Sequence, residues 1–303
     1  MIILPIPARF LLGGPVSFVS DLSHARRSYA EELRVVAPVL RNEAVVEAFA
    51  TVPREAFAGP GPWLILPPFS NETSFRSPSE DPRWLYHNVL VSIDEARDLN
   101  NGQPSLWARL FDSLDLTPGT RVLQVGAGTG YYSAILAELV GPTGRVTAVE
   151  YDGVLAARAQ ANLATWPQVE VVAADGTLHD AGEVDVIIVF AGATHPATLW
   201  LDRLAEGGRL LLPLTAAKGR GLLLKATRRG AWFEAESLGP CGFFPCFGLR
   251  NDRAAECLAR AIRDLKGTPV PIKALHTGAP PENADHVWYA GPGFWLSREP
   301  VEA

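Results

Sequence analysis

This 303-residue sequence lacks several features that define common classes of protein. It has three cysteines, at positions 241, 246 and 257, and no cluster of cysteine or histidine accompanies them. A disulfide framework or a structural zinc site is therefore not expected, and thiols in a reducing cytoplasm are the simplest interpretation. Prolines, glycines and Arg9 interrupt the apolar first 15 residues, so neither a cleaved signal peptide nor a membrane span of ~18 apolar residues is predicted.

An excess of positive charge is also missing. The chain has 27 basic against 33 acidic residues, a formal net charge of −6, and its basic residues are scattered. Nucleic acids are bound mainly through clustered lysine and arginine side chains, so a nucleic-acid partner is not expected. The chain is nevertheless long and apolar enough to bury the core of one domain of about 200 residues, with extensions.

Glycine, by contrast, is placed in an ordered pattern between residues 121 and 130. An apolar run ends in Gly126, Gly128 and Gly130, and residues 131–139 have the pattern of a helix. Glycine has no Cβ and accepts a positive φ, so the backbone of such a turn can approach a ligand closely. The free N–H groups that open the helix would face that ligand. Tight turns also use glycine without a ligand, so the turn alone is a weak signal.

Two carboxylates follow at the ends of the next predicted strands. Glu150 ends a strand predicted over residues 144–149, 20 positions after Gly130. An acidic side chain at this place accepts ribose hydroxyls in dinucleotide folds. Asp175, followed by Gly176, ends a third strand over 169–174. Its carboxylate would accept the amine of an adenine ring, or else cap a local turn.

Further apolar segments at residues 184–190 and 208–213 continue the alternation of strand and helix. Such alternation predicts right-handed βαβ units and a parallel sheet, in which ligands lie beyond the carboxyl ends of the strands. Residues 220–237 predict a hairpin beside it. We therefore predict an α/β fold with a Rossmann-like, seven-stranded, mostly parallel sheet, a terminal antiparallel hairpin and helices on both faces.

Two classes of cofactor compete for the predicted site. Nicotinamide and flavin enzymes usually carry G-x-G-x-x-G, whereas this turn reads G-x-G-x-G and continues with the bulky Tyr131. The terminal hairpin is a second difference. Together with the glycine turn and the two carboxylates, it resembles the class I S-adenosylmethionine-dependent methyltransferases, which we favour over a dinucleotide enzyme.

Four segments narrow the resemblance to one family. Residues 52–57, 101–104, 184–193 and 204–210 are similar to segments of the protein-L-isoaspartate O-methyltransferase family, and the resemblance runs from about residue 30 to about residue 237. It implies an enzyme that uses S-adenosyl-L-methionine and releases S-adenosyl-L-homocysteine. The cofactor-binding residues that it implies are Gly126, Ala127, Gly128, Gly130, Glu150, Tyr151, Asp175, Gly176 and Phe190.

The same resemblance places the acceptor at a loop before the glycine turn. In the family, a Thr-x-Ser-Gln-Pro loop holds the damaged residue, whose carboxylate attacks the methyl group of the cofactor. The residues that would contact an acceptor here are Asn101, Gly102, Gln103 and Pro104, with Tyr86 from a segment upstream.

Three departures from the family pattern affect this prediction. Asn100 and Gly102 stand at the Thr and Ser positions, so the hydroxyl beside the reacting carboxylate is absent. Gln124 replaces the acid before the glycines, although an amide still accepts a hydrogen bond. We hypothesise transfer to a carboxylate or another nucleophile of a different peptide, protein or small-molecule acceptor. The alternatives are a true isoaspartyl repair enzyme and a cofactor-binding module without transferase activity.

A catalytic base depends on the acceptor. A carboxylate needs none, whereas a hydroxyl or an amine needs one to remove its proton. The two candidates are His195, beyond the fourth strand, and His87, beside Tyr86. His195 is more simply explained as a residue that precedes Pro196 at the start of a helix.

The predicted organisation has three parts. An N-terminal arm and helical cap with the acceptor loop covers residues 1–115, the cofactor-binding core covers 116–237, and a C-terminal extension covers 238–303. Helical patterns span 25–49, with Pro38 expected to split the run, and 252–266. The aromatic extension, with a final strand over 287–296, would line an acceptor pocket or pack as a lid or dimer contact. The oligomeric state is not predicted.

Overall fold

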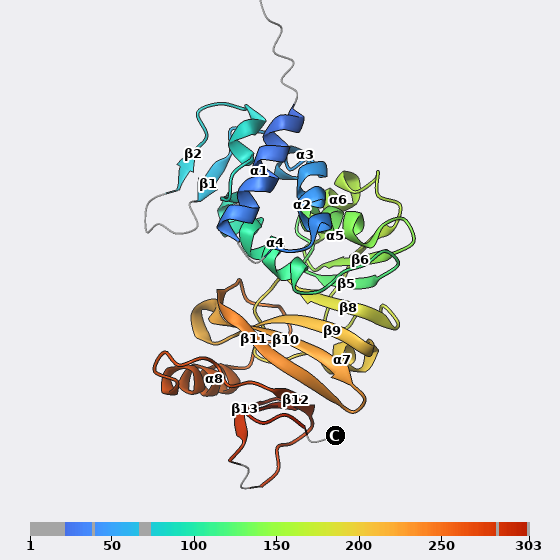
Figure 1. The fold of residues 1–303 in the computed structure, drawn as a ribbon. Coiled ribbons are helices and arrows are strands. Elements are labelled where there is room, and N and C mark those ends of the chain that lie inside the picture. Colours follow the sequence, from blue (N-terminus) through green and yellow to red (C-terminus); the bar gives the residue numbers. More distant parts are fainter. Residues whose placement is uncertain (1–21, 38–39, 67–73, 283–284, 302–303) are drawn as a thin grey trace, which may run out of the picture.

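The computed structural model describes residues 22–37, 40–66, 74–282 and 285–301 (Figure 1). Within these ranges, one sheet of 10 strands has the order β13-β14-β12-β11-β10-β9-β8-β5-β6-β7. Its strands are β5 (Arg121–Val125), β6 (Arg145–Glu150), β7 (Val169–Ala173), β8 (Val184–Val189), β9 (Leu204–Thr215), β10 (Arg220–Arg229), β11 (Trp232–Gly242), β12 (Ala274–Thr277), β13 (Val287–Gly291) and β14 (Phe294–Ser297).

Five neighbouring strands of this sheet are parallel, in the order β7, β6, β5, β8 and β9. Strands β10 and β11 then form the antiparallel hairpin. The predicted mixed α/β sheet, with a parallel core and antiparallel C-terminal strands, is confirmed. The predicted boundary after residue 237 falls inside β11, so the core sheet runs directly into the C-terminal extension.

The extension adds three strands where one was predicted. The prediction of a single strand over 287–296 was wrong, because Gly293 adopts a φ of +74° and lets the chain reverse between β13 and β14. Strand β12 pairs with β14 and with the outer edge of β11. The sheet therefore continues past the seven predicted strands without a break, as the lower half of Figure 1 shows.

Helices cover both faces of the sheet, as predicted. They are α4 (Pro104–Asp112), α5 (Tyr131–Val140), α6 (Gly153–Asn162), α7 (Thr198–Arg203) and α8 (Asp252–Asp264). Val122 of β5 packs in one apolar cluster with residues of α4, α5 and α6. The next residue, Leu123, points to the opposite face and packs in a cluster that contains Trp200 of α7 and Leu258 of α8.

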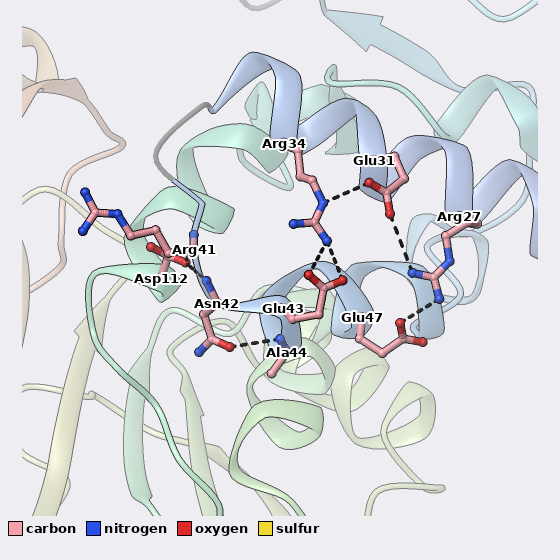
Figure 2. Close-up of polar contacts among 9 residues, drawn as sticks. All are labelled: Arg27, Glu31, Arg34, Arg41, Asn42, Glu43, Ala44, Glu47 and Asp112. Atoms are coloured by element: carbon pink, nitrogen blue, oxygen red, sulfur yellow. Dashed lines mark hydrogen bonds and ion pairs between the residues drawn. The ribbon is translucent and has the colours of Figure 1, made fainter.

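The N-terminal cap contains α1 (Leu22–Val36), α2 (Glu43–Thr51) and α3 (Glu55–Ala58). The helical run predicted over 25–49 is thus divided in two; Pro38, expected to divide it, lies outside the described residues. Ion pairs from Arg27 to Glu47 and from Arg34 to Glu43 link α1 to α2 (Figure 2).

Helix α2 begins at a well-formed cap. The side-chain oxygen of Asn42 accepts a hydrogen bond from Ala44 N at 2.9 Å, which satisfies one of the free N–H groups at the start of the helix. Asp112, at the end of α4, accepts bonds from the backbone N of Arg41 and Asn42 at 2.9 and 2.7 Å. These bonds therefore connect the N-terminal cap to α4, the helix that follows the predicted acceptor loop.

A second, small sheet was not predicted. Its strands, in the order β2-β1-β3-β4, are β1 (Leu64–Leu66), β2 (Phe75–Arg76), β3 (Leu90–Asp94) and β4 (Leu99–Asn100), accompanied by short 3-10 turns at η1 (Pro82–Leu85) and η2 (Glu95–Arg97); a third such turn, η3 (Ala217–Gly219), precedes β10. Strand β4 ends where the acceptor loop starts, and α4 begins where it finishes. Among the helices of the described ranges, none has the length and apolar character needed to cross a bilayer.

Candidate active site

A cavity of about 1040 Å³ lies at the carboxyl ends of β5 and β8. The glycine turn forms one wall, the predicted acceptor loop forms another, and residues 240–245 of the extension close a third side. The cavity thus joins the two sites that the sequence predicted separately. Of the predicted cofactor-binding and acceptor residues, those that line the cavity are Asn101, Gly102, Gln103, Gly126, Ala127, Gly128 and Phe190.

The glycine turn has the backbone that its sequence predicts. Gly126 has a φ of +88° and Gly130 a φ of +94°, values that residues with a Cβ rarely adopt. A Cβ on Gly130 would also lie 2.7 Å from Leu163 Cδ1, closer than real atoms approach. The turn therefore keeps its backbone bare towards the cavity, and this leaves a cradle for a flat or extended ligand.

Glu150 stands beside this cradle with its carboxylate buried. Its two oxygens accept hydrogen bonds from Gly128 N at 2.7 Å and Asp152 N at 3.0 Å. Burial raises the pKa of the Glu150 carboxyl, while these backbone donors act to lower it. Each oxygen keeps a second lone pair, so the ionised carboxylate can still accept two ribose hydroxyls.

Asp175 follows β7 at the next strand end. Its Oδ1 accepts bonds from Thr177 N at 2.9 Å and from Thr177 Oγ1 at 2.7 Å, whereas its Oδ2 accepts none from a described residue. The adjacent Gly176 packs so tightly that a Cβ there would lie 2.7 Å from Val125 Cγ1. The free Oδ2 suits an exocyclic amine, and these strand-end groups together fit the ribose and adenine of S-adenosyl-L-methionine.

Two aromatic residues of the predicted cofactor set are stacked on partners that the sequence analysis missed. Tyr151 is 55% exposed, and its ring stacks on Phe247 of the extension at 4.1 Å between centroids. Phe190 stacks on Trp107 of α4 at 3.5 Å and 14°. The site therefore includes side chains from segments far away in sequence.

Gln124, which replaces the family acid, is fully buried. Its Oε1 accepts a hydrogen bond from Ser133 Oγ at 2.7 Å, and its Nε2 has no partner among the described residues. The Gln124 amide oxygen thus bonds to α5, while the buried Nε2 donor is left without a partner among the described residues.

The polar side chains of the acceptor loop hold the loop itself. Asn100 Oδ1 accepts from Gly102 N at 3.0 Å, and Gln103 Nε2 donates to Ser105 Oγ at 2.9 Å. Asn101 Oδ1 accepts from Val91 N at 3.0 Å and from the guanidinium of the fully buried Arg54 at 3.3 Å. Pro104 then starts α4, as the first helical residue.

Gly102 lies under the indole of Trp107. Its φ is +78°, and a Cβ there would lie 2.6 Å from Trp107 Nε1. Trp107 lines the cavity, and its Nε1–H donates to no described residue. Because α4 begins at Pro104, Trp107 falls in the first turn of the helix, directly over the loop that precedes it.

Nine predicted residues do not line the cavity: Gly130, Pro104, Glu150, Tyr151, Asp175 and Gly176, described above, and Tyr86, His87 and His195. Tyr86 is buried in the N-terminal cap, where its hydroxyl donates to Glu55, and burial raises its pKa. His87 is exposed, and its backbone oxygen accepts from Arg54. His195 bonds through Nδ1 to Thr194 Oγ1 at 2.8 Å; burial and then the charge of Arg250 lower its pKa.

Residues from three distant segments complete the cavity; of these segments, only the aromatic extension was predicted, as one alternative, to line an acceptor pocket. These residues are Trp107 and Arg109 of α4, Arg220 at the start of β10, and Phe243, Phe244 and Arg250 of the extension. Only Trp107 carries a local signal, its spacing from Pro104. Within the described ranges, no group of three or more histidine, cysteine, aspartate or glutamate residues is placed to hold a metal ion.

Comparisons with known proteins show the family to which the chain is similar. The family model described as Protein-L-isoaspartate(D-aspartate) O-methyltransferase (PCMT) matches residues 77–251, more than half of the chain. A protein-L-isoaspartate O-methyltransferase of Methylorubrum populi is 32% identical over 228 residues, which cover 74% of this chain and 96% of that protein. One of Methanothermobacter thermautotrophicus is 29% identical over 214 residues, covering 69% and 89%.

Solved structures show the same fold. A protein-L-isoaspartate O-methyltransferase superposes with a TM-score of 0.60 at 20% identity, covering 90% of this chain and 87% of that one. A Plasmodium falciparum protein of the same description, in complex with S-adenosyl-L-homocysteine, superposes with a TM-score of 0.58 at 19% identity, covering 73% and 97%.

Proposed function

The chain belongs to the protein-L-isoaspartate(D-aspartate) O-methyltransferase family of S-adenosylmethionine-dependent methyltransferases, and we propose that it methylates a carboxylate of a polypeptide other than the isoaspartyl residue. The family methylates isoaspartyl residues of proteins. The observation that carries the proposal is the replacement of the family serine by Gly102 beneath Trp107.

On the cofactor side, we propose that the chain binds S-adenosyl-L-methionine in the manner of its family. Glu150 would hold the ribose, Asp175 the adenine amine and the glycine turn the methionine portion. When bound, the sulfonium supplies an activated methyl group. The protein is left to hold the acceptor in line with that group and to exclude water, effects that supply several kcal/mol when the geometry is right.

On the acceptor side, Trp107 takes the space of the missing serine. A side chain at position 102 would collide with Nε1, so the family hydroxyl cannot be restored while the indole stays in place. The indole N–H is a donor and never an acceptor, whereas a serine hydroxyl is both. We propose that this N–H meets the acceptor carboxylate, which needs no base to react.

Two matched peptides and one variant test the proposal. Radiolabelled methyl transfer is measured with a peptide that contains isoaspartate and with the same peptide containing aspartate. Faster transfer to the aspartyl peptide is expected. The Trp107→Phe variant keeps an aromatic ring but lacks the donor, so its kcat/KM should fall about tenfold while affinity for S-adenosyl-L-homocysteine is unchanged.

Isoaspartyl repair is the second candidate function, because the similar curated proteins carry that name. Turnover of the isoaspartyl peptide at the rate of a true repair enzyme would establish repair and refute the proposal. Binding of S-adenosyl-L-homocysteine without transfer to any peptide or small acid would instead leave a cofactor-binding module.

A further inference from the structure

The acceptor side of the cavity carries positive charge, and no carboxylate among its described lining residues compensates it. Arg109, Arg220 and Arg250 line it, and its described lining contains neither aspartate nor glutamate. The chain as a whole has a formal net charge of −6. The cationic wall formed by these three arginines is therefore a local feature of the cavity.

Arg250 is fixed in this wall by neutral acceptors. Its Nη1 donates to Gly192 O at 3.1 Å, to Thr215 O at 3.0 Å and to Thr215 Oγ1 at 2.8 Å, and its Nη2 donates to Ala216 O at 2.8 Å. Carbonyl and hydroxyl oxygens orient a guanidinium without neutralising it. The full charge of Arg250 therefore acts on the cavity, and it also contributes to the lowered pKa of His195.

The other two arginines, Arg109 of α4 and Arg220 of β10, lie near the open end of the β10–β11 hairpin. Arg109 donates to Leu238 O at 2.9 Å, while the guanidinium of the exposed Arg220 makes no hydrogen bond or ion pair with a described residue. Arg220 is paired with Gly242 of β11, four residues after Leu238. Four residues of strand span about 13 Å, so the cationic wall is long enough to meet more than one side chain of an extended ligand.

We infer that the cationic wall binds acidic side chains that flank the methylated carboxylate in a polypeptide acceptor. The inference rests on the proposed function, whose acceptor it specifies. An extended peptide advances about 3.3 Å per residue, so carboxylates within a few positions of the reacting residue reach the arginines. Guanidinium groups bind carboxylates through paired, charge-assisted hydrogen bonds, and those of Arg109 and Arg220 keep donors free for them.

Three labelled peptides test this inference on the full chain loaded with S-adenosyl-L-homocysteine. They share one central aspartate and differ only in flanking residues, which are glutamate, glutamine or lysine. Fluorescence anisotropy should show the glutamate peptide binding roughly tenfold more tightly than the glutamine peptide, and the lysine peptide most weakly. The difference should shrink as salt is added, because these groups are partly exposed.

Substitutions assign the effect to the cationic wall. Arg109→Gln and Arg220→Gln should each weaken the glutamate peptide about three- to tenfold and leave the glutamine peptide unchanged. Arg263→Gln removes an exposed charge on α8, away from the cavity lining, and serves as the matched control. Equal binding of the glutamate and glutamine peptides, no binding of any peptide, or equal losses for both peptides in the variants would overturn the inference.

The outcomes also separate this inference from the proposed function. Failure to bind S-adenosyl-L-homocysteine, measured by titration calorimetry, would refute the proposed function. Cofactor binding and methyl transfer without preference for flanking acids would refute only the role of the cationic wall.

Discussion

The cofactor side of the site, at the strand ends beside the cavity, and the acceptor side of the cavity are built in different ways. Gly126, Glu150 and Asp175 stand at the ends of three adjacent parallel strands, so the sheet alone brings them together. Trp107 and Arg250 come from α4 and the extension, which are far apart in the sequence. Gln124 departs from the family pattern on the cofactor side, and Asn100 and Gly102 depart from it in the acceptor loop. We therefore expect the strand ends to hold the methyl donor and the surrounding segments to determine what receives the methyl group.

The largest effect should come from removing the ribose acceptor. Glu150→Ala deletes a buried carboxylate that would accept two ribose hydroxyls and also holds Gly128 N. Hydrogen bonds to a charged group contribute roughly 1.5–3 kcal/mol, so affinity for S-adenosyl-L-homocysteine should fall about a hundredfold in titration calorimetry. Glu170→Ala, which removes an exposed ion pair with Arg145, is the control and should bind normally. Unchanged affinity in Glu150→Ala would show that this side of the cavity does not hold the ribose.

On the acceptor side, the largest effect concerns stability. Gly102→Ser places a side chain at a φ of +78° and against Trp107 Nε1. Strain and overpacking of this kind cost about 1–3 kcal/mol in the free energy of unfolding, measured with urea. The loss should be smaller in a Trp107→Ala background, with a coupling energy above about 0.5 kcal/mol. Strictly additive losses would mean that Trp107 is not what excludes a serine.

These two regions also differ in how far the sequence predicts them. Glu150 and Asp175 could be placed because parallel strands of known order end on one edge, so spacing along the chain fixes position in space. Arg250 could not, because its place depends on the turn that brings the extension back over β8 and β9. The resemblance to the family placed Tyr86 near the acceptor, but its side chain lies in the N-terminal cap after η1, and its hydroxyl donates to Glu55.

A smaller effect should appear on the cofactor side as the pH is lowered. Burial raises the pKa of the Glu150 carboxyl, and only the ionised form accepts both ribose hydroxyls. Binding of S-adenosyl-L-homocysteine favours the carboxylate and releases a proton, so affinity should fall as the pH drops through this raised pKa, about tenfold per unit below it. The fall should begin at a higher pH than an ordinary glutamate would give. In Glu150→Gln this dependence should disappear; its persistence would assign it to another group.

The smallest expected effect tests where the two regions meet. Tyr151 belongs to the cofactor side, but its ring stacks on Phe247 of the extension, and both rings are more than half exposed. An aromatic pair contributes about 0.5–1.5 kcal/mol beyond its buried area, and less when solvent reaches it, so Tyr151→Ala should weaken S-adenosyl-L-homocysteine about threefold. Tyr151→Phe keeps the ring and should bind normally. If Phe247→Ala weakens the cofactor as much as Tyr151→Ala does, residues of the extension support the donor as well as the acceptor. If only Tyr151→Ala has an effect, the division between the two sides runs between these rings.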